Sequence, residues 1–443
     1  MKVGAARRVD AVRTQLWPLP VFAVALAVIL GSVVPALDAA VDGQLPESVA
    51  AFLFSGGPEA ARSVLQAISG SLMTVTSLTF SLTVVTLQLA SSQFSPRLLR
   101  TFTSDRFVHG TLALFLAAFA FALTVLRSVR DESSGNTAFV PEIAVTVAFV
   151  LAIASVLGLV LFLAHLTREI RVETMMRRVN VETQETIGRV FPEDRPTPGP
   201  GPVAPPAAVR IRSTRSGFLT TFDKAALLRA AADAAAVIQV DSQPGSSLVE
   251  GVPFATAWPA DPLATFTPEA REQLTTSINA AVATGFERTN VQDVGFGFRQ
   301  LVDVAARALS PGINDPTTAV HVIGHLSVLL CRLASRDPGP ERLADERTGK
   351  VQVVIALPDL GDLLELAMNQ PRQYGVADPA VAGRLLALLQ ELTWCDRNGR
   401  YRKEILEHLG RMRSAISDAT YAPAERKTLL DQADAIEAMH PQG

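Results

Sequence analysis

The chain has 443 residues, a mean hydropathy of +0.26 and 19% charged residues, below the roughly 25% of an average soluble domain. Only 19 of its 83 charged residues lie in residues 1–166, and the other 64 lie in residues 167–443. This distribution, with a net charge of −3, excludes a wholly soluble enzyme, a disordered protein and a basic nucleic-acid-binding protein. The two cysteines, Cys331 and Cys395, cannot form a disulfide framework and do not indicate an oxidising compartment.

Residues 1–167 predict a membrane domain of four helices. A helix needs about 20 apolar residues to cross a bilayer, and four segments of that length carry no charge. They are Thr14–Leu37, Ser63–Pro96, Phe107–Leu126 and Ile143–Thr167. The first segment is too long for a secretory signal and no clear cleavage site follows it, so we expect it to be retained.

The loops between these segments predict the orientation of the membrane domain. Cytoplasmic loops carry an excess of lysine and arginine. The N-terminal tail, the loop after the second segment and the residues after the fourth hold 11 basic residues, and the two opposite loops hold three. We therefore expect a multi-pass protein of the bacterial inner (plasma) membrane with both termini in the cytoplasm.

The second segment is uncharged but rich in hydroxyl groups, which form two rows at helical spacing. One row, a candidate lining for a pore, contains Thr74, Ser77, Ser81, Gln88 and Ser92. The other row contains Thr76, Thr79, Thr83 and Thr86. Both rows could serve helix packing, or one could line a hydrated path, because hydroxyls and amides replace part of the hydration shell of an ion.

The inner end of this segment contains Pro96, Arg97 and Arg100, which we consider candidates for the inner mouth of such a path. Proline breaks or kinks a helix, and the two arginines would then meet lipid headgroups or anionic solutes. Surface anchoring is the simpler interpretation. His165, near the end of the fourth segment, is interpreted as an interfacial residue.

The rest of the chain predicts a cytoplasmic α+β domain, so the fold class is mainly α. Residues 168–209 are expected to form a helical extension followed by a proline-rich, extended linker. Residues 210–260 predict a small β-rich module, in which residues 210–222 form a hairpin and Asp223 caps a short helix. Residues 261–443 predict a helical region, with amphipathic patterns throughout 351–438. Cys395 is expected in its core.

Polar residues are densest in the stretch 287–315, which we call the polar corner. One helix is expected to end before Ser310, and Asp315 with Pro316 is expected to cap and start the next. The corner could bind an anion through Arg307, Asn314 and free backbone amides, or it could be a structural corner whose amides Asp315 already satisfies. Its candidate residues are Glu287, Arg288, Asp293, Arg299, Asp303, Arg307, Asn314 and Asp315.

The sequence gives no sign of catalysis or of a bound cofactor. No nucleophile–base set or glycine-rich phosphate loop appears. His321 and His325 have metal-compatible spacing, but no third ligand is near them in the sequence. We therefore expect neither an enzyme nor a metal site.

Two long stretches resemble a known family. The segments LTFSLTVVTLQLASSQFSPRLLRTFTSDR and ERTNVQDVGFGFRQLVDVAARALSPGINDPTTA are similar to a bacterial family of predicted membrane proteins, catalogued as domain of unknown function 2254. The resemblance covers most of the chain. It implies N-terminal spans and a cytoplasmic C-terminal domain, and it implies no established activity.

Two functions remain open from the sequence. The first is a homo-oligomeric, channel-like pore lined by the second segment and assembled or gated by the cytoplasmic domain. The second is a membrane-anchored sensor or interaction scaffold whose cytoplasmic domain binds an ion, a small ligand or a partner. In both cases the expected partners are the lipid bilayer and further copies of the chain, and no nucleic acid.

Overall fold

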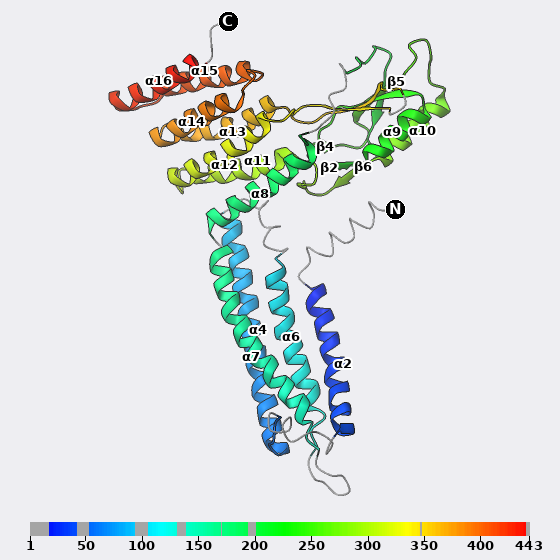
Figure 1. Ribbon diagram of the computed structural model, residues 1–443, viewed down its shortest axis with the longest axis vertical. Helices are drawn as coiled ribbons and strands as arrows, with labels where there is room; N and C mark the ends of the chain where they lie inside the picture. Colours follow the sequence, from blue (N-terminus) through cyan, green and yellow to red (C-terminus); the bar gives the residue numbers. More distant parts are fainter. Residues whose placement is uncertain are drawn as a thin grey trace. The chain divides into compact units, whose positions relative to one another are not determined.

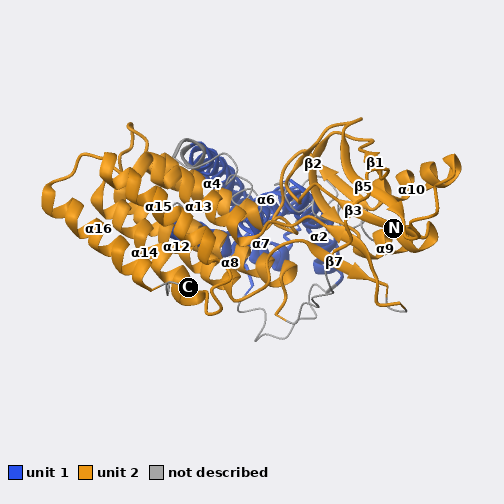
Figure 2. Ribbon diagram, turned by 90° about the horizontal axis from the view of Figure 1, so that it is seen from above, with its two compact units in different colours: residues 1–174 blue, residues 175–443 orange. Residues whose placement is uncertain are grey.

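The computed structural model describes residues 17–41, 53–93, 105–130, 139–169, 171–193, 201–345 and 348–439. The chain divides into two compact units, residues 1–174 and 175–443 (Figure 2). It is mainly helical, with several long apolar helices in the first unit and a smaller sheet region in the second (Figure 1).

In the part of the first unit that the structure describes there are four long helices (Figure 1). They are α2 (Pro18–Val41), α4 (Pro58–Gln93), α6 (Arg106–Leu126) and α7 (Glu142–Glu169). The middle helix of the unit is α6, which packs against the other three and is the most buried of them. Alanines and phenylalanines of α6 form much of the core, including Phe115, Ala118 and Phe121.

Two contacts fix α2 to this unit. At Gly31 a Cβ would lie 2.8 Å from Cβ of Thr124, so the absence of a side chain allows α2 to approach α6 closely. At the end of α2, the buried carboxylate of Asp38 accepts hydrogen bonds from the backbone amides of Ile143 (2.9 Å) and Ala144 (3.3 Å). Asp38 therefore satisfies amides in the first turn of α7 that have no partner within that helix.

Among the described residues, five helices are long and apolar enough to cross a membrane, one more than expected from the sequence. The fifth is α12 (Pro316–Ala334) in the second unit. It packs against α11 (Val294–Ala308), α13 (Leu360–Gly375) and α14 (Pro379–Cys395). A helix surrounded by neighbours is apolar on most of its faces, which explains its hydropathy.

The second unit contains two sheets. The five-stranded sheet has the order β1-β5-β3-β8-β7, and the three-stranded sheet has the order β4-β2-β6. The strands are β1 (Val209–Arg212), β2 (Gly217–Phe222), β3 (Ala236–Val240), β4 (Ser247–Leu248), β5 (Pro253–Pro259), β6 (Val282–Gly285), β7 (Glu341–Ala344) and β8 (Val351–Ile355). The expected hairpin of residues 210–222 is wrong, because β1 pairs with β5 whereas β2 pairs with β4 and β6.

The sheets extend beyond residue 260, the expected end of the β-rich module, because β6, β7 and β8 lie after it. The strand β8, in a stretch expected to be helical, runs parallel to β3 and lies between β3 and β7 in the larger sheet. A parallel neighbour requires a long crossover, and here residues 241–350 supply it. The helices α9 (Lys224–Asp233) and α10 (Pro268–Ala280) contribute to the same apolar core as the strands. Asp223 caps α9 as predicted.

The remaining helices form a bundle (Figure 2). It comprises α11 to α14 with α15 (Arg402–Asp418) and α16 (Pro423–Ala438). The helix α8 (Val172–Val190), expected to belong to an extension, packs into this unit through buried residues. Asn180 donates a hydrogen bond to the carbonyl of His325, and Thr183 lies directly against Gly297 of α11.

A buried histidine in α15 predicts an acid-sensitive fold. Burial lowers the pKa of His408 below 6.5, although Glu365, 3.4 Å away, opposes the shift. The unfolded chain therefore takes up a proton first as the pH falls below about 6.5, and the free energy of unfolding decreases. Thermal unfolding of His408→Gln in detergent should show a smaller loss of Tm between about pH 7 and pH 5 than the wild type. Equal slopes in His408→Gln and the wild type would contradict the prediction.

Candidate functional site

One row of hydroxyls in α4 is turned into the first unit. Thr79, Thr83 and Thr86 are buried, and each donates a 2.8 Å hydrogen bond to the carbonyl four residues earlier. Thr76 makes the same bond at 2.6 Å. Such bonds satisfy each hydroxyl within its own helix, and the burial of this row indicates helix packing.

The other row lies on the outer surface of α4. Thr74, Ser77, Ser81 and Gln88 are exposed in the single chain. Ser92 belongs to α4, but its side chain lies outside the described residues. Pro96, Arg97 and Arg100, the candidates for the inner mouth, also lie outside the described part of the chain. The two rows of hydroxyls therefore have different surroundings, which the sequence did not distinguish.

The exposed row is part of a longer seam along α4. Eight exposed residues follow one another at alternating spacings of four and three, namely Ser63, Ala67, Gly70, Thr74, Ser77, Ser81, Val84 and Gln88. We call this set the α4 seam. Most of its members are small or carry a hydroxyl, whereas its flanks hold bulky exposed residues such as Leu78 and Phe80. This spacing is that of helices packed at a small crossing angle, and small residues are typical of helix interfaces in membranes.

A polar contact joins the start of α6 to the last turns of α7. Nε2 of His165 lies 2.5 Å from a carboxylate oxygen of Asp105, which also caps α6 through the amide of Phe107. The ring of Phe107 lies 4.7 Å from that of His165. His165 therefore links α7 to the first turn of α6.

The polar corner of the second unit is split along α11. Glu287, Arg288 and Asp293 precede the helix, and Arg307, Asn314 and Asp315 lie at or beyond its end. The 15 residues of α11 separate these groups by about 22 Å at 1.5 Å per residue. Between them, Arg299 contacts Gln370 at 3.5 Å, and Asp303 lies half-buried on the same helix. The eight residues therefore do not form one site.

At the start of α11, Asp293 and Arg288 form a buried ion pair. Two nitrogens of the guanidinium donate to the two carboxylate oxygens at 2.8 and 2.9 Å, and Asp293 also accepts the amide of Phe296. The Asp293 side chain is only 3% exposed. Burial raises the pKa of Asp293, and the hydrogen bond and charge of Arg288 oppose that shift.

A turn of the sheet region closes over this pair. Gly245, between β3 and β4, has φ +88, and a Cβ there would lie 2.1 Å from a carboxylate oxygen of Asp293. Only glycine fits both the backbone conformation and the contact. The ion pair therefore joins the sheets to the helical bundle, which is a structural role.

At the other end of α11, Asp315 caps α12 as expected. Its carboxylate accepts the amide and the hydroxyl of Thr318, and these hydrogen bonds lower its pKa. Asn314 before it adopts φ +48. Asp315 thus occupies the first turn of α12, where a bound anion would need free amides.

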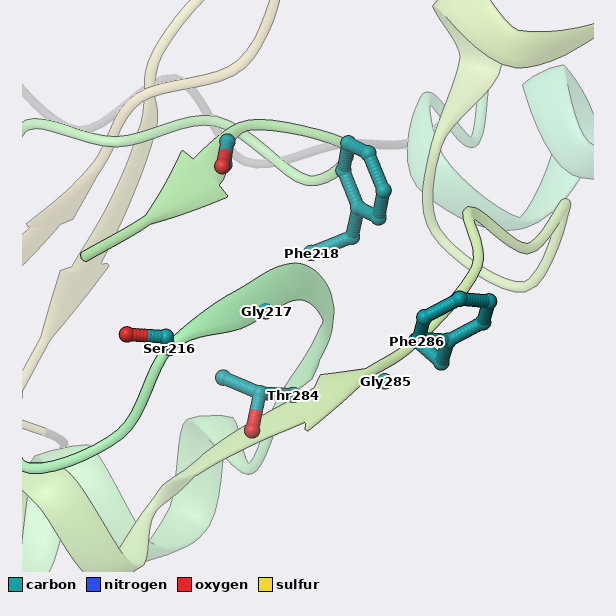
Figure 3. Close-up of a pocket in the computed structure, with 7 residues that line it drawn as sticks. Ser216, Gly217, Phe218, Thr284, Gly285 and Phe286 are labelled. Carbon is teal, nitrogen blue, oxygen red and sulfur yellow. The ribbon is translucent and has the colours of Figure 1, made fainter. Parts of the chain in front are cut away.

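An open groove lies at one end of the smaller sheet, a feature that the sequence analysis missed (Figure 3). Its volume is about 460 Å³. The lining residues are Ser216, Gly217, Phe218, Ser247, Thr284, Gly285 and Phe286. The ring of Phe286 is 95% exposed, which is unusual for a large apolar side chain. The groove forms where strand pairing brings segments together that are far apart in the sequence, so no local sequence pattern predicts it.

No group of three or more histidine, cysteine, aspartate or glutamate side chains suited to a metal ion occurs in the described ranges. The α4 seam and the groove are the two candidate functional features.

Comparison with known proteins places the chain among membrane proteins. A family model described as "Predicted membrane protein (DUF2254)" matches residues 13–391. An uncharacterized protein of Mycobacterium bovis is 35% identical over 389 residues, which cover 86% of this chain and 72% of that relative. An uncharacterized protein of Mycobacterium tuberculosis shows the same identity and coverage. No solved structure matches the chain.

Proposed function

The chain belongs to the DUF2254 family of predicted membrane proteins, and from this membership we propose that its copies associate through α4 around a hydroxyl-lined, channel-like path. The observation that carries the proposal is the α4 seam. It runs along a helix apolar enough to cross a membrane, and all eight of its members are exposed in the single chain.

Lipid is a poor environment for such a seam. Apolar tails fill the space beside small residues badly, and helices in membranes associate through close packing and polar contacts. The amide of Gln88 adds a cost, because it needs hydrogen-bond partners in a medium without water. A neighbouring copy of α4 supplies close packing for the small residues. That copy, or water on an axis between copies, supplies hydrogen-bond partners for Gln88.

The buried row of threonines on α4 also supports the α4 seam as the face between copies. Threonines that bond their own backbone, such as Thr79 and Thr83, make α4 stable beside α6 and α7. This leaves Ser77 and Ser81 on the opposite side, where they make no hydrogen bond with another described residue. Uncharged hydroxyls of this kind can contact a hydrated ion without holding it tightly.

We further propose four spans, with α12 remaining in the helical bundle of the second unit. The packing of α12 against three helices supports this count. The excess of basic residues, 11 against three, supports an inner-membrane protein with both termini in the cytoplasm. In this arrangement the second unit assembles or gates the pore and does not catalyse a reaction. The helix α8 begins three residues after the end of α7 and connects the membrane helices to the second unit.

Planar bilayers containing the purified protein should conduct. Ser81→Leu and Gln88→Leu should lower or abolish the conductance, because they replace polar groups of the seam by bulky apolar ones. The matched pair Thr74→Val and Thr79→Val separates lining from packing, since both threonines bond their own backbone and only Thr74 lies in the seam. The first change should alter conductance and the second should not. Silent bilayers with folded, oligomeric protein would contradict the pore.

The groove supports a second candidate, a membrane-anchored sensor or interaction scaffold. Its two phenylalanine rings and three hydroxyl side chains could hold a small ligand or a partner segment (Figure 3). In this role the membrane helices only anchor the chain. A protein that stays silent in bilayers and whose second unit is stabilised by a ligand would favour this role over the pore.

A further inference from the structure

The two cysteines of the chain meet in the helical bundle. Cys331 lies in the last turn of α12, and Cys395 is the last residue of α14. The helices pack against each other (Figure 2). Both cysteines are free thiols that are only partly buried, and neither belongs to the buried core, so the expectation that Cys395 lies in the core is wrong. Its neighbour Trp394 is largely exposed because this end of α14 reaches the surface.

Their proximity follows from the direction of the two helices. At Gly324 a Cβ would lie 3.8 Å from the Arg384 guanidinium, and the hydroxyl of Ser327 donates to the carboxylate of Glu391. Contacts thus advance in the same direction along α12 and α14, as expected of parallel helices separated by α13. One turn beyond Ser327 and Glu391 come Cys331 and Cys395, four residues on in each helix.

The two thiols lie where the backbone carries partial negative charge, which attracts a cation and disfavours unbound thiolates. Parallel helices bring both C-terminal ends to one place, and each end carries partial negative charge. The thiol of Cys331 contacts that of Cys395, and Ser327 lies beside it. Glu391, one turn before Cys395, is paired with Arg384.

We propose that Cys331 and Cys395 form a two-thiol site for a soft monovalent metal ion of the Cu(I) class. Thiolates select soft ions, and Cu(I) accepts two sulfur ligands in a linear arrangement. Binding forms two metal–sulfur bonds, releases the two thiol protons to water and changes no oxidation state. The described residues hold no third side chain placed to complete a zinc-type site, which needs four ligands. The site is independent of the pore proposal.

The test is an anaerobic titration of the full-length protein in detergent with Cu(I), in competition with a chromophoric Cu(I) chelator. We expect one Cu(I) per chain and protection of both thiols from a thiol reagent. Cys331→Ser and Cys395→Ser should each weaken binding by about 100-fold or more, since a single thiolate remains. Ser335→Ala, an exposed position on the next turn, should bind like the wild type. Zn(II) should compete poorly.

Three results would overturn the site. They are the absence of Cu(I) binding by folded protein, binding that survives both cysteine substitutions, and one ion shared between two chains. Circular dichroism of each serine variant shows whether it is folded, and the near-isosteric exchange of sulfur for oxygen should preserve the fold. If the two thiols formed an intramolecular disulfide in air and the reduced protein did not bind Cu(I), the cysteines would be a redox pair and the metal site would be wrong.

Discussion

A Gly297→Val variant is expected to lose about 3 kcal/mol of unfolding free energy, the upper end of the usual cost of overpacking. A Cβ at this position would lie 1.8 Å from Oγ1 of Thr183 and 2.8 Å from its Cβ. Thr183 cannot turn away, because it is buried and its hydroxyl bonds the carbonyl of Val179. The valine therefore pushes α8 off α11.

Thermal unfolding of the full-length protein in detergent, followed by circular dichroism, measures this loss. Gly295→Ala is the matched control two residues away in the same helix. The nearest atom to a Cβ there is 3.5 Å distant, an ordinary contact, so alanine should be neutral or gain up to about 1 kcal/mol of helix propensity. Equal effects of the two changes would mean that α8 does not depend on this contact.

An Arg288→Leu variant is expected to lose about 3–5 kcal/mol, the usual cost of leaving one charge of a buried pair without its partner. The carboxylate of Asp293 would remain nine-tenths buried with only the amide of Phe296. Replacing Glu437 by Gln, which breaks the exposed pair with Arg413, should cost less than about 1 kcal/mol.

The pH dependence of the Arg288→Leu variant separates a lost charge partner from lost packing. Burial already raises the pKa of Asp293, and removing Arg288 removes the group that opposes the shift. The folded variant then binds a proton more readily than the unfolded chain. Its deficit relative to the wild type should therefore shrink as the pH falls toward the raised pKa. A deficit that does not change with pH would indicate lost packing alone.

Hydropathy and capping patterns predicted those helices whose position depends only on residues close together in the sequence. Hydropathy located the apolar helices of the first unit, and the Asp315-Pro316 pair marked the start of α12. The position of β8 between β3 and β7 was not predictable, because its partner β3 lies more than 110 residues earlier and no local property records the pairing. The predicted hairpin failed for the same reason, since β1 and β2 each find a distant partner.

The candidate site was predicted in part. The periodicity of α4 separated two rows of hydroxyls, but which row faces the protein depends on where α6 and α7 pack. The seam could have been recognised from its alternating spacing, which also includes Gly70 and Ala67. The packing of α8 on α11 had one local sign, the glycine at position 297, because a glycine inside a helix often marks a close contact.

The contact of Asp38 with the start of α7 has a consequence for how the chain is made. The acceptor lies in the first long helix of the unit, and its donors appear 105 and 106 residues later. At about 5–20 residues per second, roughly 5–20 s of synthesis separate the two. Until residues 143 and 144 have been synthesised, Asp38 cannot accept these two hydrogen bonds. The contact between α2 and α7 therefore forms only after the two intervening helices, α4 and α6, have been synthesised.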